Sequence, residues 1–387
     1  MKNTVGSAHL DLLRTVAAWQ VCLHHLKNLF FVDYPIVQSK NLLVQAIYYF
    51  SRFGHQSVVI FFVMSGLFIS SSVIKQNDEG KWSWANYLIA RLSRLYIALV
   101  PALILGFGWD WLGIKLLGTA NVYDGVTLSQ TVVSHPVIER LDLVHFLGNL
   151  GFLQSFKVSP LGSNTPLWSL SYEFWYYILF PLMFLMIVKK GLTITRIIYA
   201  AAFVIVINFI GLTLSQNFLI WLFGVAVLYS FKEFKFPVKY RNVLTLFAIA
   251  LLLVAIMFTL FIPSESLYVA DIIVGIAASV LIYALIQYDQ LIDQNHIYPR
   301  TVHALANFSY SLYLLHVPLL VFLTAVFLKN ERWQPDLIHL FYGMLLFVVI
   351  ILYAYGISCF TEAKTHVLKN WMTNGLNLLT QKIKSIF

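Results

Sequence analysis

The chain has 387 residues, of which 59% are hydrophobic, 16% are aromatic and only 11% are charged, with a formal net charge of +9. An ordinary soluble domain is about 25% charged, so this chain could not cover its apolar side chains with a charged surface. The composition excludes a soluble enzyme, a disordered chain and a secreted disulfide scaffold, and it indicates a protein that crosses a membrane several times.

About ten stretches are apolar and long enough to cross a bilayer, which takes roughly 20 residues. They are expected at 10–31, 55–74, 95–115, 168–188, 196–214, 216–231, 242–262, 267–288, 306–328 and 337–360. The predicted fold class is therefore all-α, a polytopic membrane helix bundle of about ten transmembrane helices. The first ten residues lack the pattern of a cleaved signal peptide, so the first apolar run is expected to remain as a helix.

The positive charges predict the orientation of this bundle. If the N-terminus is cytoplasmic, most of the 26 Lys and Arg residues fall on inner segments, and both chain ends lie inside. This count places Lys2, Lys189 and Lys190 inside and Lys329 outside. Because this bias accounts for the charge, the sequence gives no reason to expect a nucleic-acid partner.

The remaining segments divide the chain. Residues 1–360 are expected to form one transmembrane domain, and 361–387 a cytoplasmic amphipathic tail that ends at Phe387 and contacts membrane lipid. The longest loop, 116–167, falls outside and contains a short apolar piece at 141–156, which we interpret as interfacial or re-entrant. A loop of this length is often functional.

Ionisable residues occur within the first span. Asp11 precedes Arg14 by three residues and can pair with it. Arg14 and His25 are eleven residues apart, so they project from one helix face about 16 Å apart along the axis. One interpretation places both on the wall of a cavity. In the other, Arg14 extends to the inner interface and His25 hydrogen-bonds between helices. His24 points about 100° away from His25 and is expected to pack or to support it.

Two arginines precede the third span. Arg91 and Arg94 are neighbours on one helix face. A pair of guanidinium groups suits an anionic phosphate ligand, because each can bind phosphate oxygens in a fork. The alternative is purely topological, since Arg commonly marks the inner end of a span.

The fourth and ninth spans carry further polar groups. Glu173 lies among aromatic residues after Trp168 and Ser171, where poor solvation suits it to acid or base chemistry; the alternative is an aromatic belt with one first-turn carboxylate. Tyr313 and His316 share a helix face, and such residues commonly hydrogen-bond between helices. Asp110, Asp271 and His339 are isolated in the sequence, and no chemistry is assigned to them.

Several catalytic patterns are missing from the sequence. It contains no HExxH, GxSxG, CxxC or GxxxxGK[ST] motif, so zinc-protease, serine-esterase and P-loop chemistry are not supported. The two cysteines, Cys22 and Cys359, lie in apolar stretches and indicate neither a disulfide framework nor a metal site.

Five motifs, taken in order, resemble the membrane acyltransferase-3 family, whose members acylate extracytoplasmic saccharides in bacteria, among other acceptors. The motifs are Asp11-Leu12-Leu13-Arg14 with His25, Phe61-Phe62-Val63-Met64-Ser65-Gly66, Arg91-x-x-Arg94, Trp168-Ser169-Leu170-Ser171-x-Glu173 and Ser309-Tyr310-Ser311-Leu312-Tyr313-Leu314-x-His316. The chain departs from the family pattern at Leu12, where glycine is usual, and at Val59, where an acidic residue often occurs.

The resemblance implies an O-acyltransferase that uses acyl-coenzyme A, in the usual case acetyl-coenzyme A, and no metal. Arg14, Arg91 and Arg94 are then expected to bind the donor, and His25 to act as general base or, as the less favoured alternative, to carry the acyl group. Glu173 is expected to orient or charge-balance the imidazole, or to bind the sugar. Residues expected to contact substrate or to support the site are Asp11, His24, Ser65, Trp168, Ser171, Tyr313 and His316.

The same resemblance implies a bacterial cytoplasmic membrane and a saccharide or lipid-linked glycan acceptor, such as lipopolysaccharide O-antigen, capsule or exopolysaccharide. The secreted esterase-like domain of some relatives is missing, so such a periplasmic partner is expected on a separate chain. Two other functions stay open. One is a secondary transporter or flippase, since buried ionisable residues also mark transport pathways. The other is acylation of a small acceptor such as a macrolide sugar.

Overall fold

The computed structural model describes residues 4–128, 132–188, 193–263, 266–293, 296–328 and 331–384. The described part of the chain is helical, with isolated bridges in place of β-strands, which confirms the predicted all-α class. Lys2, Lys189, Lys190, Lys329 and Phe387, on which the orientation and tail predictions partly depend, lie outside the described residues.

Among the described residues, eight helical segments are long and apolar enough to cross a membrane. They are Leu42–Asp78, Trp84–Leu117, Thr165–Val188, Ile194–Glu233, Val238–Phe261, Leu267–Ile286, Ser309–Phe327 and Leu337–Leu378. The first predicted span corresponds to α1 (Val5–Phe30), which is not among these eight and carries Asp11, Arg14 and Lys27. A helical membrane bundle is therefore confirmed.

Two of the predicted spans, 196–214 and 216–231, form one helix. This helix, α7 (Ile194–Glu233), contains a break at Gly211, whose φ of 78° and ψ of 178° are not helical. Glycine reaches positive φ without the clash that a Cβ causes, so the chain can change direction there without a loop. The sequence predicts the break but not the continuity of the helix.

The chain forms two compact units, and α1 contributes to both. Unit 1 comprises Met1–Val21, Phe53–Glu79 and Trp168–Ala306. Its further helices are α3 (Gly54–Asp78), α6 (Trp168–Val188), α7, α8 (Arg241–Phe258), α9 (Leu267–Ile286) and α10 (Ile297–Ala306).

Helices α3 and α7 approach each other closely through two glycines. A Cβ placed on Gly66 would lie 2.0 Å from the backbone oxygen of Trp221, and one on Gly224 would lie 2.1 Å from that of Val63. Small residues allow helix backbones to come close in a membrane, where packing stabilises helix association. The Gly66 of the second sequence motif therefore serves the packing of unit 1.

Unit 2 comprises Cys22–Arg52, Gly80–Leu167 and Asn307–Phe387. It contains the end of α1 together with α2 (Leu42–Phe50), α4 (Trp84–Leu117), α5 (Leu143–Leu150), α11 (Ser309–Phe327), α12 (Leu337–Phe360) and α13 (Thr365–Lys384). The apolar piece expected at 141–156 contains α5, with Leu143, Val144 and Leu147 exposed. The long loop is tied to α4 because Asp110 accepts two hydrogen bonds from Ser163, at 2.7 and 2.8 Å.

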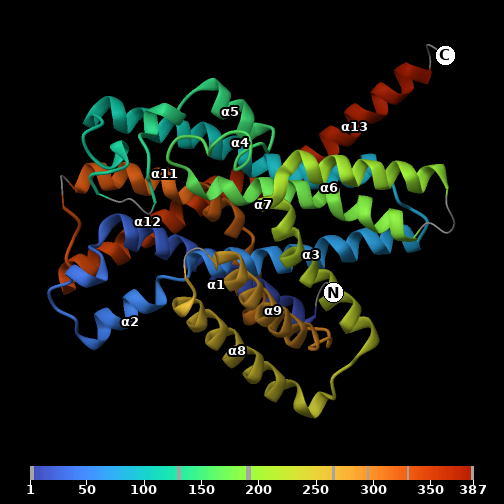
Figure 1. Ribbon diagram of the computed structural model, residues 1–387, viewed down its shortest axis with the longest axis horizontal. Helices are drawn as coiled ribbons and strands as arrows, with labels where there is room; N and C mark the ends of the chain where they lie inside the picture. The colour runs from blue at the N-terminus through green and yellow to red at the C-terminus, as the bar shows by residue number, and fades with distance from the viewer. Residues whose placement is uncertain are drawn as a thin grey trace. The chain divides into compact units, whose positions relative to one another are not determined.

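The C-terminal tail is helical, as the amphipathic pattern predicts. Helix α13 contacts α4, leads to the C-terminus in Figure 1, and exposes Val367, Trp371 and Leu378. Its position on a membrane surface stays a prediction. Two short helices, α2 and α10, were not predicted, since neither is long enough to stand out as an apolar run.

Candidate active site

Two histidines of unit 2 meet inside the helix bundle. Nδ1 of His25, near the end of α1, lies 2.8 Å from Nε2 of His316 on α11. The ring centroids are 5.0 Å apart, and His316 is completely buried. The structure therefore joins two residues that the sequence places 291 positions apart.

The hydrogen bonds of this pair determine where the protons lie. Nδ1 of His316 is 2.9 Å from the backbone oxygen of Leu312. A carbonyl oxygen can only accept, so Nδ1 of His316 carries the proton and its Nε2 carries the lone pair. Nδ1 of His25 must then donate to Nε2 of His316. In the neutral pair this leaves Nε2 of His25 with a lone pair that can accept a proton.

His24 holds this part of α1 in place. Its Nδ1 lies 3.1 Å from the backbone oxygen of Ser51, and the side-chain amide of Asn28 donates to its Nε2 at 3.0 Å. Both ring nitrogens are thus engaged by protein groups. His24 therefore connects α1 to the segment between α2 and α3.

Helix α11 is anchored next to its histidine. Tyr313 donates from its hydroxyl to the backbone oxygen of Pro166 at 3.2 Å, and its ring centroid is 6.3 Å from that of His316. The side-chain amide of Asn164 donates to the backbone oxygen of Leu314 at 2.9 Å. These bonds fix α11 against the end of the long loop and so restrain the ring of His316.

Helices α4 and α11 pack side by side in the same direction. A Cβ on Gly106 would lie 3.3 Å from Cγ of Pro318, and the rings of Trp109 and Phe322 are 5.0 Å apart. Residue numbers increase in the same sense along both helices at these contacts, so α4 and α11 run parallel. Positions along α4 can therefore be compared with positions along α11.

This register places the arginine pair at some distance from the histidine pair. Arg94 precedes Gly106 by twelve residues, or about 18 Å along α4, while His316 precedes Pro318 by two residues, or about 3 Å. Arg94 therefore lies about 15 Å along the bundle from the level of His316. Arg91 is half-buried and Arg94 exposed, so a cation faces outward at this end of unit 2.

Unit 1 contains the other predicted residues, beginning with the first part of α1. Arg14 and Asp11 form the expected pair, with a nitrogen and an oxygen 3.4 Å apart. The second carboxylate oxygen of Asp11 lies 3.2 Å from Nδ1 of His303. The guanidinium of Arg14 is also 5.5 Å from the ring centroid of Phe68, so it lies over an aromatic face.

The motif residues on α3 and α6 are held by hydrogen bonds within unit 1. Ser65 accepts a hydrogen bond from the indole of Trp221 at 3.2 Å. The hydroxyl of Ser171 donates to the backbone oxygen of Trp168 at 2.9 Å. The hydroxyl of Tyr177, one turn further along α6, donates to the carboxylate of Glu173. The predicted residues Glu173 and His25 belong to different units.

Unit 1 also contains a histidine and aspartate pair that is not predicted from the sequence. Nε2 of His55, at the start of α3, lies 2.8 and 3.0 Å from the two carboxylate oxygens of the buried Asp271 on α9. The His55 ring stacks on Trp168, with centroids 5.9 Å apart and planes at 16°. A carboxylate within a span is a signal for a buried partner, but the sequence does not identify which residue pairs with it.

Across the described ranges, no group of three or more His, Cys, Asp or Glu residues is arranged to hold a metal ion. The ionisable groups instead form pairs.

The comparisons with known proteins agree with these observations. A family model described as an acyltransferase domain, that of the acyltransferase-3 family, matches residues 7–358. No curated protein and no solved structure matches the chain significantly. The matched range includes all five motifs and both histidines of the pair, and it covers nearly the whole chain. The protein is a membrane acyltransferase that belongs to the acyltransferase-3 family.

Proposed function

We propose that this acyltransferase moves an acyl group, in the usual case acetyl, from cytoplasmic acyl-coenzyme A to a hydroxyl of a cell-surface saccharide, with His25 as the general base. The observation that carries the proposal is the bonded pair of His25 and His316, which leaves Nε2 of His25 as a basic nitrogen. The family match favours acyl transfer over the transporter function considered from the sequence.

The reaction requires one proton transfer and one exchange of bonds at the thioester carbonyl. Nε2 of His25 takes the proton of the acceptor hydroxyl as its oxygen attacks the carbonyl carbon. The new carbon–oxygen bond forms, the carbon–sulfur bond breaks, and coenzyme A leaves as the thiolate, which recovers the proton from His25. Meanwhile His316 accepts the hydrogen bond from Nδ1 and holds the ring of His25 in one orientation.

The arginines supply the binding site for the donor. Coenzyme A is rich in phosphate, and guanidinium groups bind phosphate oxygens in a fork. Arg91 and Arg94 lie about 15 Å along the bundle from His316, so an extended arm that starts at the phosphates can bring a thioester toward the histidines. Arg14, which belongs to unit 1 and pairs with Asp11, stays a prediction for donor binding.

The proposed topology gives the two substrates opposite entrances. The protein lies in a bacterial inner membrane with both chain ends in the cytoplasm. The end of unit 2 that carries Arg91 and Arg94 then faces the cytoplasm, where coenzyme A is found. The acceptor reaches the site from the extracytoplasmic side in this topology. In this proposal Glu173 binds a sugar hydroxyl, while Tyr177 keeps its carboxylate in place.

The test is acyl transfer in membranes that contain the chain, with acetyl-coenzyme A labelled in the acetyl group. The variant His25→Ala should still bind coenzyme A, yet transfer no label to glycan. The control is His339→Ala, because His339 lies in the first turn of the last span, α12, and bonds to Asp336 at 2.7 Å. Near-normal transfer by His25→Ala would refute the general-base assignment, whereas loss of transfer in both variants would indicate general damage.

A further inference from the structure

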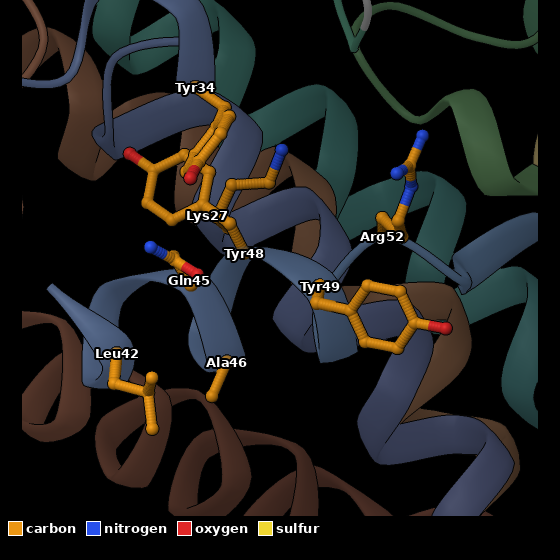
Figure 2. A pocket seen from close by; sticks show the side chains of 8 residues that line it. All are labelled: Lys27, Tyr34, Leu42, Gln45, Ala46, Tyr48, Tyr49 and Arg52. Atoms are coloured by element: carbon orange, nitrogen blue, oxygen red, sulfur yellow. The ribbon is translucent and has the colours of Figure 1, made fainter. Parts of the chain in front are cut away.

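A pocket in unit 2 lies outside the chemistry proposed above. It has a volume of about 720 Å³ and lies between the end of α1 and helix α2, as Figure 2 shows. Pockets that bind small molecules range from about 300 to 1,000 Å³. Its lining combines cations, tyrosines, an amide and two apolar side chains, namely Lys27, Tyr34, Leu42, Gln45, Ala46, Tyr48, Tyr49 and Arg52. We call it the basic pocket.

The basic pocket is rich in positive charge. Within the described part of the chain, neither Lys27 nor Arg52 has a carboxylate at ion-pair distance. The acidic group that acts on Lys27 is Asp33, but both its oxygens are bound by Arg332, at 2.6 and 3.2 Å. Lys40 adds a further cation over the ring of a lining tyrosine. The lining thus carries two cations, and the carboxylate that acts on Lys27 is already bound by Arg332; such a site attracts an anion.

The tyrosines give the basic pocket a second character. Nζ of Lys27 lies 5.6 Å from the ring centroid of Tyr48, and the rings of Tyr34 and Tyr48 are 5.6 Å apart. Figure 2 shows these three side chains together on one side, with Tyr49 and Arg52 on the other. A tyrosine presents an apolar face and a polar edge. A sugar ring has the same two features, with C–H groups on its faces and hydroxyls on its edge.

We propose that the basic pocket binds an acidic sugar of the acceptor, a ring that carries a carboxylate or a phosphate. Arg52 binds the anionic group in a fork, Lys27 neutralises it, and the tyrosine rings pack on the sugar face. This inference rests on the proposed transfer to a saccharide and extends it, because it identifies the charge class of the acceptor.

On this proposal the acidic sugar and the acylated sugar are different units of one glycan. Lys27 follows His25 by two residues, which is about 200° around the helix, so the two side chains leave opposite sides of α1. An α-helix with its side chains is about 10 Å across. The acceptor that satisfies both positions is therefore an acidic oligosaccharide or polysaccharide whose chain passes around the end of α1.

The test is binding of a glycan probe to the full chain in nanodiscs of neutral lipid. One probe is a tetrasaccharide of alternating glucuronic acid and N-acetylglucosamine, and the other is the same molecule with its carboxyl groups reduced to alcohols. The double variant Lys27→Gln with Arg52→Gln should bind the acidic probe at least about tenfold more weakly. One control, Lys115→Gln, removes a charge from the C-terminal end of α4, outside the pocket lining. The other, Lys27→Arg, keeps the positive charge in the pocket. Both control variants should bind the acidic probe as the parent does.

Equal affinity of the parent for the two probes would overturn the proposal, and so would undiminished binding by the double variant. Competition by glucose 1-phosphate would support it and extend the site to phosphate. If phosphatidylglycerol in the nanodisc displaces the acidic probe from the parent, the basic pocket is a lipid headgroup site and the proposal fails. The variant His25→Ala should bind the acidic probe as the parent does. If the parent binds the probe in a charge-dependent manner but transfers no acyl group, the proposed function is refuted while the sugar-binding proposal stands.

Discussion

Replacing His316 tests the idea that the histidine pair fixes the proton on the correct nitrogen. In the variant His316→Ala, Nδ1 of His25 loses the acceptor that lies 2.8 Å away. The His25 ring can then take the other tautomer, with the proton on Nε2 and the lone pair on Nδ1. General bases contribute about 10²- to 10⁴-fold to a rate. We therefore expect kcat to fall by about 10²- to 10³-fold, which corresponds to about 3–4 kcal/mol of transition-state stabilisation.

The variant His316→Gln separates this effect from a loss of packing. Its side-chain oxygen can occupy the position of Nε2 and accept the bond from His25, so kcat should remain within about tenfold of the parent. The assay is release of free coenzyme A at saturating acetyl-coenzyme A, with thermal unfolding in detergent as the measure of folding. If His316→Gln is as inactive as His316→Ala while both fold, the proton-placement argument is wrong.

Three further outcomes follow from the structure. Arg94→Gln should raise the KM for acetyl-coenzyme A with little change in kcat. Added salt should raise this KM more in the parent than in the variant, and an equal effect of salt on both would contradict the phosphate contact. Ser163→Ala leaves the buried carboxylate of Asp110 with one hydrogen bond fewer, so the free energy of unfolding should fall by about 1–3 kcal/mol, measured by denaturation in detergent. Gly66→Ala should prevent folding, because its Cβ would lie 2.0 Å from the oxygen of Trp221, and normal yield of folded protein would show that α3 and α7 can separate.

Much of the fold can be predicted from the sequence because a membrane imposes a simple rule. Backbone groups in lipid must bond within their own segment, so each long apolar run forms a helix. The rule does not say whether two runs are joined. The break at Gly211 has no loop, since glycine alone supplies the change of direction, and the runs on either side form α7. Short helices such as α2 are also not predicted by this rule, because they do not span the bilayer.

The candidate site could be predicted only where its contacts are local. The pair of Asp11 and Arg14 follows from helical spacing, and the structure confirms it. The partner of His25 is 291 residues away, so periodicity could indicate that His316 is buried but not what it contacts. Likewise, Asp271 is isolated in the sequence because its partner, His55, lies on another helix. Pairs between helices depend on tertiary packing that one sequence does not display.

A pair of imidazoles has a physical advantage over an imidazole and a carboxylate at this depth in the bundle. Burying an ionised group in an apolar interior is costly, whereas two neutral rings can hydrogen-bond without any net charge. His316 is completely buried, and its bond to Leu312 needs only a neutral ring. In the proposed reaction a positive charge exists on His25 only while the proton is in transit, next to the negative charge that develops on the substrate. Burying the neutral pair in the resting site therefore carries little electrostatic penalty. The penalty of a charged imidazole arises only in the proton-transfer step, where the negative charge on the substrate offsets it.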